Sequence, residues 1–313
     1  MSLLKNIVNH GNNIASFKNA VAAKRIASAW LFVGPSGIGK KKTALAFAQI
    51  LVCENTKVAE ACGHCPPCLR IEKQQSESLL LVEPKGAQIK IEQARQIIDF
   101  LSLMKIGRSR VVIVDGGEYL NPAAANALLK TLEEPPEDTF LILIAKSLSG
   151  ILPTIRSRVQ VMRFATLSPA QIKQIAGVEE WVAATCGGSI EQAQRLAAAD
   201  NFKALRENFF NRLEVNCSNS GKGTFPEVKD VIGDKEASLF LLQALQLWVR
   251  DLFRLRILPE SHFPADLAWS KVFLHRGDEF LNELWEYVQT MERDVLGNVD
   301  RQLCFESFFQ RIR

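Results

Sequence analysis

The chain has 313 residues and a formal net charge of +4, from 38 Lys and Arg against 34 Asp and Glu. Its composition, 47% hydrophobic and 23% charged, is typical of soluble globular proteins and excludes disordered and membrane-embedded classes. So weak a basic excess also argues against a protein that coats nucleic acid on its own. The length predicts two or three domains.

No apolar stretch approaches the roughly 18 residues of a membrane span, and MSLLKNIVNH lacks the charged and apolar regions of a signal peptide. We therefore expect no membrane partner and a cytoplasmic location. The chain has seven cysteines, and four of them lie close together after residue 52. In a reducing compartment such clustering indicates a metal site rather than disulfides.

The first half of the chain has the pattern of an α/β domain. Trp30–Val33 predicts a buried strand that enters a glycine turn, and Lys42–Cys53 then has the apolar spacing of a helix. Val111–Val114 and Phe140–Ile144 are continuous apolar runs, as in parallel strands covered on both faces. A predicted helix over Pro122–Leu132, between these two runs, continues the alternation.

Past about residue 165 the strand signals end and helices are predicted. Ser168 and Pro169 are typical of an N-cap followed by proline at the first helical position. The pair Gly187–Gly188 separates two further predicted helices, and Cys217–Thr224 has the composition of a loop. Ala237–Arg313 has amphipathic helical spacing throughout.

A phosphate-binding loop is predicted where the first strand ends. The sequence GPSGIGK fits G-x-x-x-x-G-K between a strand and a helix, where backbone N–H groups, a helix N-terminus and a lysine surround phosphate. The next residue normally binds Mg²⁺ through a hydroxyl, but here it is Lys41, and Thr43 would point to another side of the helix. The candidate nucleotide-binding residues are Gly34, Pro35, Ser36, Gly37, Ile38, Gly39, Lys40 and Lys41.

Three interpretations of this loop stay open: a glycine turn kept for packing, residual nucleotide binding, and competent hydrolysis. Asp115 ends a predicted strand and supplies the carboxylate expected to organise Mg²⁺, but Gly116 stands where hydrolytic ATPases of this class need a glutamate. Glu118 is either a replacement that swings back or a salt-bridged surface side chain. The sequence therefore gives no firm expectation that this chain binds ATP with Mg²⁺.

The clustered cysteines predict a structural zinc site. In the spacing C-x8-C-x2-C-x2-C, tight turns at Gly63 and Pro66-Pro67 bring closely spaced thiolates onto one ion, and four thiolates suit tetrahedral Zn²⁺ with no open position for catalysis. A ligand role for His64 and a set of metal-free thiols are the alternatives. The predicted ligands are Cys53, Cys62, Cys65 and Cys68, whereas Cys186, Cys217 and Cys304 are isolated.

Three segments resemble a known family: SAWLF leading into GPSGIGK at residues 28–40, AANALLKTLEEPP at 124–136 and LPTIRSR at 152–158. They are similar to clamp-loader subunits of the AAA+ class from bacterial DNA polymerase III, over residues 1 to about 205. The resemblance, together with the helical patterns, implies an α/β AAA+ P-loop core at 1–165 with a zinc module at 53–68, which is itself a feature of the family. It also implies a helical lid domain at 166–205 and an all-α collar domain at 206–313.

Within that group the resemblance leaves two subunit types, the gamma/tau motor and the stationary delta-prime subunit. Motor subunits carry Ser or Thr where this chain has Lys41, and glutamate where it has Gly116. The lid motif that usually supplies a sensor arginine reads GSIE at residues 188–191, with an acid in the arginine's place. These losses favour the delta-prime type, without ATPase activity of its own.

One catalytic element of the family is retained. A Ser-Arg-Cys motif in the family carries an arginine that reaches the γ-phosphate bound by the neighbouring subunit, and here the motif reads Ser157-Arg158-Val159. The resemblance makes Arg158 a trans arginine finger, the alternative being an ordinary exposed arginine. Such fingers accelerate GTPases by about 10³–10⁵-fold, so a subunit without hydrolysis of its own can control its neighbour.

The implied function is that of a stator in a hetero-pentamer with delta and gamma/tau subunits, which opens the sliding clamp and places it on primed DNA. Apolar helices containing Trp248, Trp269 and Trp285 suit either a domain core or a subunit interface. Two other functions stay open. They are an active gamma-type ATPase motor and an independent zinc-dependent DNA-binding protein, and the modest net charge argues against the second.

Overall fold

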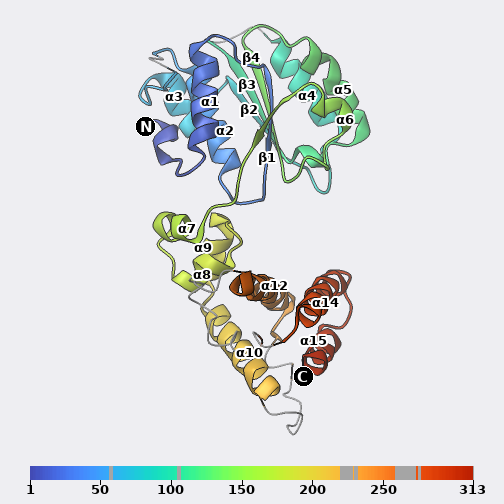
Figure 1. The fold of residues 1–313 in the computed structure, drawn as a ribbon. Coiled ribbons are helices and arrows are strands. Elements are labelled where there is room, and N and C mark those ends of the chain that lie inside the picture. Colours follow the sequence, from blue (N-terminus) through green and yellow to red (C-terminus); the bar gives the residue numbers. More distant parts are fainter. Residues whose placement is uncertain are drawn as a thin grey trace. The chain divides into compact units, whose positions relative to one another are not determined.

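The structure, a computed structural model, describes residues 1–55, 59–103, 107–218, 232–257 and 276–312, together with Val228 and Phe273. The chain divides into two compact units (Figure 1). The first contains Met1–Gln171 and Ser189–Glu191, and the second contains Ile172–Gly188 and Gln192–Arg313.

The first unit is built on a parallel sheet with the strand order β2-β3-β4-β1-β5. Trp30 pairs with Ile142 and Val112 pairs with Leu141, so the three strands predicted from continuous apolar runs lie at the centre. This position explains the runs, because central parallel strands are buried on both faces. The strands are β1 (Ala29–Val33), β2 (Leu79–Val82), β3 (Arg110–Asp115), β4 (Thr139–Ala145) and β5 (Gln160–Arg163).

Helices cover both faces of this sheet (Figure 1). On one face lie α1 (Gly11–Ala22), α2 (Lys40–Val52) and α3 (Pro66–Glu72), and on the other lie α4 (Ile91–Ser102), α5 (Pro122–Glu133) and α6 (Pro153–Arg156). Two short 3₁₀ helices, η1 (Leu3–Asn6) and η2 (Gly117–Tyr119), also belong to this unit. The α/β prediction is confirmed, including the parallel sheet.

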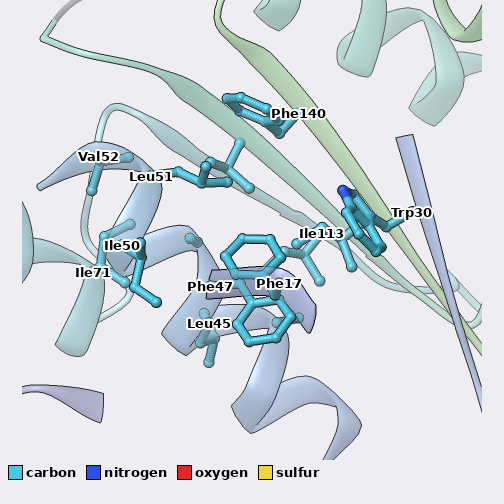
Figure 2. Packing of buried hydrophobic residues seen from close by; sticks show 14 of the residues in the cluster. Phe17, Trp30, Leu45, Phe47, Ile50, Leu51, Val52, Ile71, Ile113 and Phe140 are labelled. Atoms are coloured by element: carbon cyan, nitrogen blue, oxygen red, sulfur yellow. The ribbon is translucent and has the colours of Figure 1, made fainter. Parts of the chain in front are cut away.

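Aromatic packing holds the α1 and α2 face against the sheet (Figure 2). The rings of Phe17 and Phe47 are stacked with their centroids 3.6 Å apart, and Trp30 meets Phe17 edge to face at 5.7 Å. Phe17 and Phe47 have no exposed surface. Burial of such rings supplies much of the apolar stabilisation of a core, so α2, which begins at the phosphate loop, is firmly placed.

The predicted α5 helix begins as its sequence indicates. The side chain of Asn121 accepts a hydrogen bond from the backbone N–H of Ala124, at 2.8 Å, and Pro122 occupies the first turn. A side-chain acceptor at this position satisfies a donor that the helix leaves open, and proline loses nothing there. Ser168 caps α7 (Pro169–Ala176) similarly, since its hydroxyl accepts from the N–H of Gln171 at 3.3 Å.

The second unit is helical in the part that the structure describes, as predicted. Trp248 is fully buried there, and its ring meets those of Phe210 at 5.8 Å and Phe273 at 4.8 Å. Trp285, by contrast, is 37% exposed, and Trp269 lies outside the described residues. The helices from residue 169 onward are α7 (Pro169–Ala176), α8 (Glu180–Thr185), α9 (Ile190–Ala198), α10 (Asp200–Ser218), α12 (Lys235–Ile257), α14 (Asp278–Leu296) and α15 (Arg301–Arg311).

One predicted boundary is wrong. The loop expected over Cys217–Thr224 does not begin at Cys217, because Cys217 and Ser218 belong to α10; residues 219–224 lie outside the described part of the chain. Among the described residues, no helix combines the length and the apolar character needed to cross a membrane.

Candidate functional sites

The predicted phosphate loop connects β1 to α2. Gly37 and Gly39 have φ angles of +73° and +95°, which glycine adopts without strain. The buried Lys40 ammonium donates to the carbonyl oxygens of Gly34 and Pro35, so it lies inside the loop. Burial lowers the pKa of Lys40, while Asp115 and Glu118 act in the opposite direction. The loop therefore has the form of a phosphate cradle, with its lysine held by the loop's own backbone.

Packing also constrains this loop. A Cβ atom on Gly34 would lie 2.4 Å from the carbonyl oxygen of Phe164, much closer than real contacts allow. The backbone N–H of Ile190 donates to the carbonyl oxygen of Gly37 at 3.0 Å. Glu191 is also close: a Cβ atom placed on Gly37 would lie 3.1 Å from the Cβ of Glu191. An acid rather than an arginine thus stands beside the loop, as the GSIE sequence indicates.

Lys41 lies in the first turn of α2 and bonds two carboxylates. Its ammonium contacts an Oε1 oxygen of Glu83 and lies 3.5 Å from the Oδ2 oxygen of Asp115. Burial alone would lower the pKa of Lys41, but its hydrogen bonds and ion pairs with these two carboxylates outweigh that effect and raise the pKa. Thr43 is no substitute for the missing hydroxyl ligand, because its buried Oγ1 donates to the carbonyl oxygen of Gly39 at 3.0 Å.

Glu83 is a candidate site residue that the sequence alone did not indicate. It directly follows β2, which pairs in parallel with β3, with Val82 opposite Val114. The carboxyl ends of these two strands therefore meet at the same edge, and Glu83 comes next to Asp115. The apolar run Leu79–Val82 is a signal for the strand itself, but its place beside β3 is not visible in the sequence.

The backbone at Gly116, directly after Asp115, is unfavourable for the glutamate that hydrolytic ATPases of this class carry there. Gly116 has a φ of +103°, and a Cβ there would lie 2.8 Å from the ring of Tyr119. Glu118 is half-buried, its Oε2 has no hydrogen-bond partner, and it forms no ion pair with another described residue. The interpretation of Glu118 as a salt-bridged surface side chain is therefore wrong. Lys146, the residue after β4, donates to the Tyr119 hydroxyl at 3.1 Å.

Taken together, these residues do not fit Mg²⁺. The ion prefers a near-octahedral shell of oxygen atoms and is held in phosphate-loop enzymes by the loop hydroxyl and the strand-end aspartate. Here the hydroxyl position is an ammonium, and that ammonium already bonds Asp115. Hydrolysis at this loop would lack both its metal and its water-polarising glutamate.

The structure brings the four predicted metal ligands together. All four Sγ atoms lie within 4.8 Å of one another, and the pairs Cys62–Cys68 and Cys53–Cys65 are each 4.0 Å apart. A tetrahedron with Zn–S bonds of about 2.3 Å has sulfur atoms about 3.8 Å apart, so the residues fit zinc. When bound, the ion would be held by Cys53, Cys62, Cys65 and Cys68 as a closed structural site.

Backbone donors surround these thiols. The N–H groups of Cys62 and Cys65 donate to the sulfurs of Cys53 and Cys62, both at 3.3 Å, which favours thiolates and orients them. Hydrogen bonds from the backbone of His64 and Cys65 lower the pKa of Cys62 to about 6, whereas burial raises the pKa of Cys68. His64 itself is exposed, its ring nitrogen meets the Cys62 carbonyl oxygen at 2.9 Å, and it lies outside the sulfur cluster.

Arg158 follows α6 and is ion-paired on the surface. Its Nε donates to Oε1 of Glu133, at 2.6 Å, and its Nη1 donates to the carbonyl oxygen of Thr154 and the hydroxyl of Ser157. Glu133 is the last residue of α5. The Arg158 side chain is 32% exposed, so solvent reaches the guanidinium. Its predicted role toward a neighbouring subunit stays a prediction.

Comparisons with known proteins agree with the resemblance found in the sequence. The model of the family described as "DNA polymerase III, delta subunit" matches residues 9–168, just over half of the chain. The delta-prime subunit of DNA polymerase III from Pseudomonas aeruginosa is 40% identical over 42% of this chain and 41% of its own length. That from Bacillus subtilis is 31% identical over 66% and 65%.

A gamma subunit of DNA polymerase III is also similar. The one from Buchnera aphidicola is 27% identical over 96% of this chain and 88% of its own length. The matches to the two delta-prime relatives span less than two thirds of those proteins.

Proposed function

The chain belongs to the delta-subunit family of DNA polymerase III, a clamp-loader family, and we propose that it is the delta-prime-type, non-hydrolysing stator of a clamp loader. In this role it assembles with delta and gamma/tau subunits into a hetero-pentamer. The assembly uses ATP to place the sliding clamp on primed DNA. The observation that carries the proposal is the ion pairing of Lys41 with Asp115 and Glu83 at the expected metal position.

The chain contributes to catalysis through Arg158. The guanidinium is partly exposed and rests on Glu133 through an ion pair of the kind that contributes about 0.2–1 kcal/mol at a surface. A γ-phosphate from a neighbouring subunit carries more negative charge and accepts the same planar donors, so it can displace Glu133. In this proposal Glu133 holds the Arg158 guanidinium in the free chain, and the neighbour's γ-phosphate takes the place of Glu133 in the assembly.

The three-domain division at 1–165, 166–205 and 206–313 remains part of this proposal. Its lid would comprise α7, α8, α9 and the first residues of α10, and its collar would comprise the rest of α10 with α12, α14 and α15. Exposed apolar side chains near the turn from α14 to α15 support an interface with partner subunits, since surface apolar groups gather where proteins bind each other. Those side chains are Leu296, Val299 and Leu303, which are 48–63% exposed.

An active gamma-type motor is the second candidate, because the Buchnera gamma relative aligns over almost the whole chain. The two functions differ in whether the isolated chain turns over ATP. We expect no hydrolysis by the purified chain with ATP and Mg²⁺, and hydrolysis once gamma-type subunits are added.

Arg158→Ala tests the trans role. The variant should fold and assemble, while hydrolysis at the shared site falls by about 10³-fold, the lower bound known for GTPase fingers. Steady-state phosphate release by the mixture, with assembly checked by gel filtration, is the measurement. Unchanged hydrolysis by assembled Arg158→Ala complexes would remove the finger assignment, and robust turnover by the isolated chain would indicate the motor.

A further inference from the structure

We propose that Lys41 is a built-in replacement for the divalent cation: its ammonium occupies the Mg²⁺ position, and the phosphate loop of this chain takes no divalent ion. This inference rests on the non-hydrolysing function proposed above and explains how the site remains stable without metal. Lys41 reaches from the first turn of α2 to the ends of β2 and β3, where it bonds Glu83 and Asp115.

The charged side chains that interact at the expected metal position balance one another without a metal. Three cationic side chains, those of Lys40, Lys41 and Lys146, interact here with three carboxylates, those of Glu83, Asp115 and Glu118. An added divalent ion would face a net charge near zero rather than a cluster of free carboxylates. It would also have to displace the Lys41 ammonium from both partners, which costs the charge-assisted hydrogen bond to Glu83 and the ion pair with Asp115.

The same geometry predicts what removal of the ammonium does. Lys41→Thr would leave Glu83 and Asp115 unpaired at one sheet edge and would restore a hydroxyl where phosphate-loop proteins use one for Mg²⁺. Paired carboxylates and a hydroxyl are oxygen ligands of the kind that hard divalent cations prefer. Since the Lys41 side chain is 36% exposed, the substitution empties no core position.

Mn²⁺ is a suitable probe because its free form gives a paramagnetic resonance signal that is lost on binding. The full chain, with its cysteine site loaded with zinc beforehand, is titrated with Mn²⁺ in the absence of nucleotide. Lys41→Thr should bind one Mn²⁺ per chain. The wild type and Lys41→Arg should bind Mn²⁺ at least tenfold more weakly than this variant, with no defined site. The double variant Lys41→Thr/Asp115→Asn should lose that site again.

Two outcomes would overturn the proposal. One is Mn²⁺ binding by the wild type that Asp115→Asn abolishes, and the other is a Lys41→Thr variant that melts like the wild type yet gains no Mn²⁺ affinity. The readout is independent of ATP hydrolysis and of Arg158. A failure of the stator function, seen as turnover by the isolated chain, is therefore distinguishable from a failure of this inference.

Discussion

Glu133 contacts Arg158, the proposed finger, and mutation can separate the roles of the two residues. It ends α5 within the ANALLKTLEEPP segment and accepts from the Nε of Arg158. The two side chains are 48% and 32% exposed, so solvent screens the pair and limits its contribution to about 1 kcal/mol or less. Glu133 therefore holds Arg158 at rest but does not lock it.

Glu133→Gln should raise ATP hydrolysis by the assembled complex, and by less than about fivefold, because about 1 kcal/mol corresponds to that factor. Arg158→Lys should lower hydrolysis sharply, since lysine lacks the planar donors of arginine. Both are measured as phosphate release with gamma-type subunits. A loss of hydrolysis in Glu133→Gln as deep as in Arg158→Ala would mean that Glu133 positions the finger in the reaction rather than at rest.

At the scale of elements, the cysteine module connects α2 to α3. Cys53 follows the last residue of α2, Cys68 lies in α3, and both are fully buried in the same apolar cluster as Phe47. A metal bound by these thiolates would tie the two helices together across a long loop. Structural zinc of this kind contributes directly to folding free energy.

Zinc removal should therefore lower the melting temperature by at least about 4 °C. This shift corresponds to a loss of about 1–2 kcal/mol of unfolding free energy, since 1 kcal/mol changes the melting temperature by about 2–4 °C. The measurement is a thermal melt with and without a chelator, alongside a colorimetric assay that should find one zinc per chain. Cys68→Ser should melt at the lower temperature and no longer respond to chelator. Cys186→Ser is the control, because it changes a buried cysteine outside the cluster and should keep the chelator response. If the wild type melts at the same temperature with and without chelator, the metal is not structural.

The elements differ in how far the sequence predicts them. β1, β3 and β4 are predicted because central strands are continuously apolar, and α5 because Asn121 and Pro122 mark its start. β5 is missed because it lies at a sheet edge and pairs only with β1, so its sequence QVMR carries no apolar run. The order of strands depends on crossover packing, which no local pattern encodes.

The candidate sites likewise combine features that local motifs predict with features that depend on tertiary packing. Local motifs predict the phosphate loop, the cluster of four cysteines and the strand-end Asp115. The pairing of Lys41 with Glu83 could not be predicted, because it depends on β2 lying beside β3. The burial of Glu118 Oε2 without a hydrogen-bond partner also depends on tertiary surroundings rather than on its sequence neighbours.

At the scale of the whole molecule, the helical unit contains two kinds of apolar side chain. Trp248 is fully buried and is surrounded by aromatic rings, so it belongs to the core of this unit. Leu303, in the first turn of α15, is 63% exposed, and Leu296 and Val299 before it are exposed as well. Water contact at three apolar side chains so close in sequence favours a surface that another subunit covers.

Leu303→Glu should therefore leave stability almost unchanged, within about 0.5 kcal/mol, because the side chain lies in solvent in the isolated chain. In the assembly the new carboxylate would be buried against apolar groups, so affinity for gamma/tau and delta subunits should fall at least tenfold. Trp248→Ala is the contrasting change: it leaves a cavity in the core and should cost about 3–5 kcal/mol of unfolding free energy. Urea titration and quantitative gel filtration measure the two effects. If Leu303→Glu assembles as tightly as the wild type, the α14 to α15 turn is not the covered surface, and Trp285, at 37% exposure, becomes the next position to change.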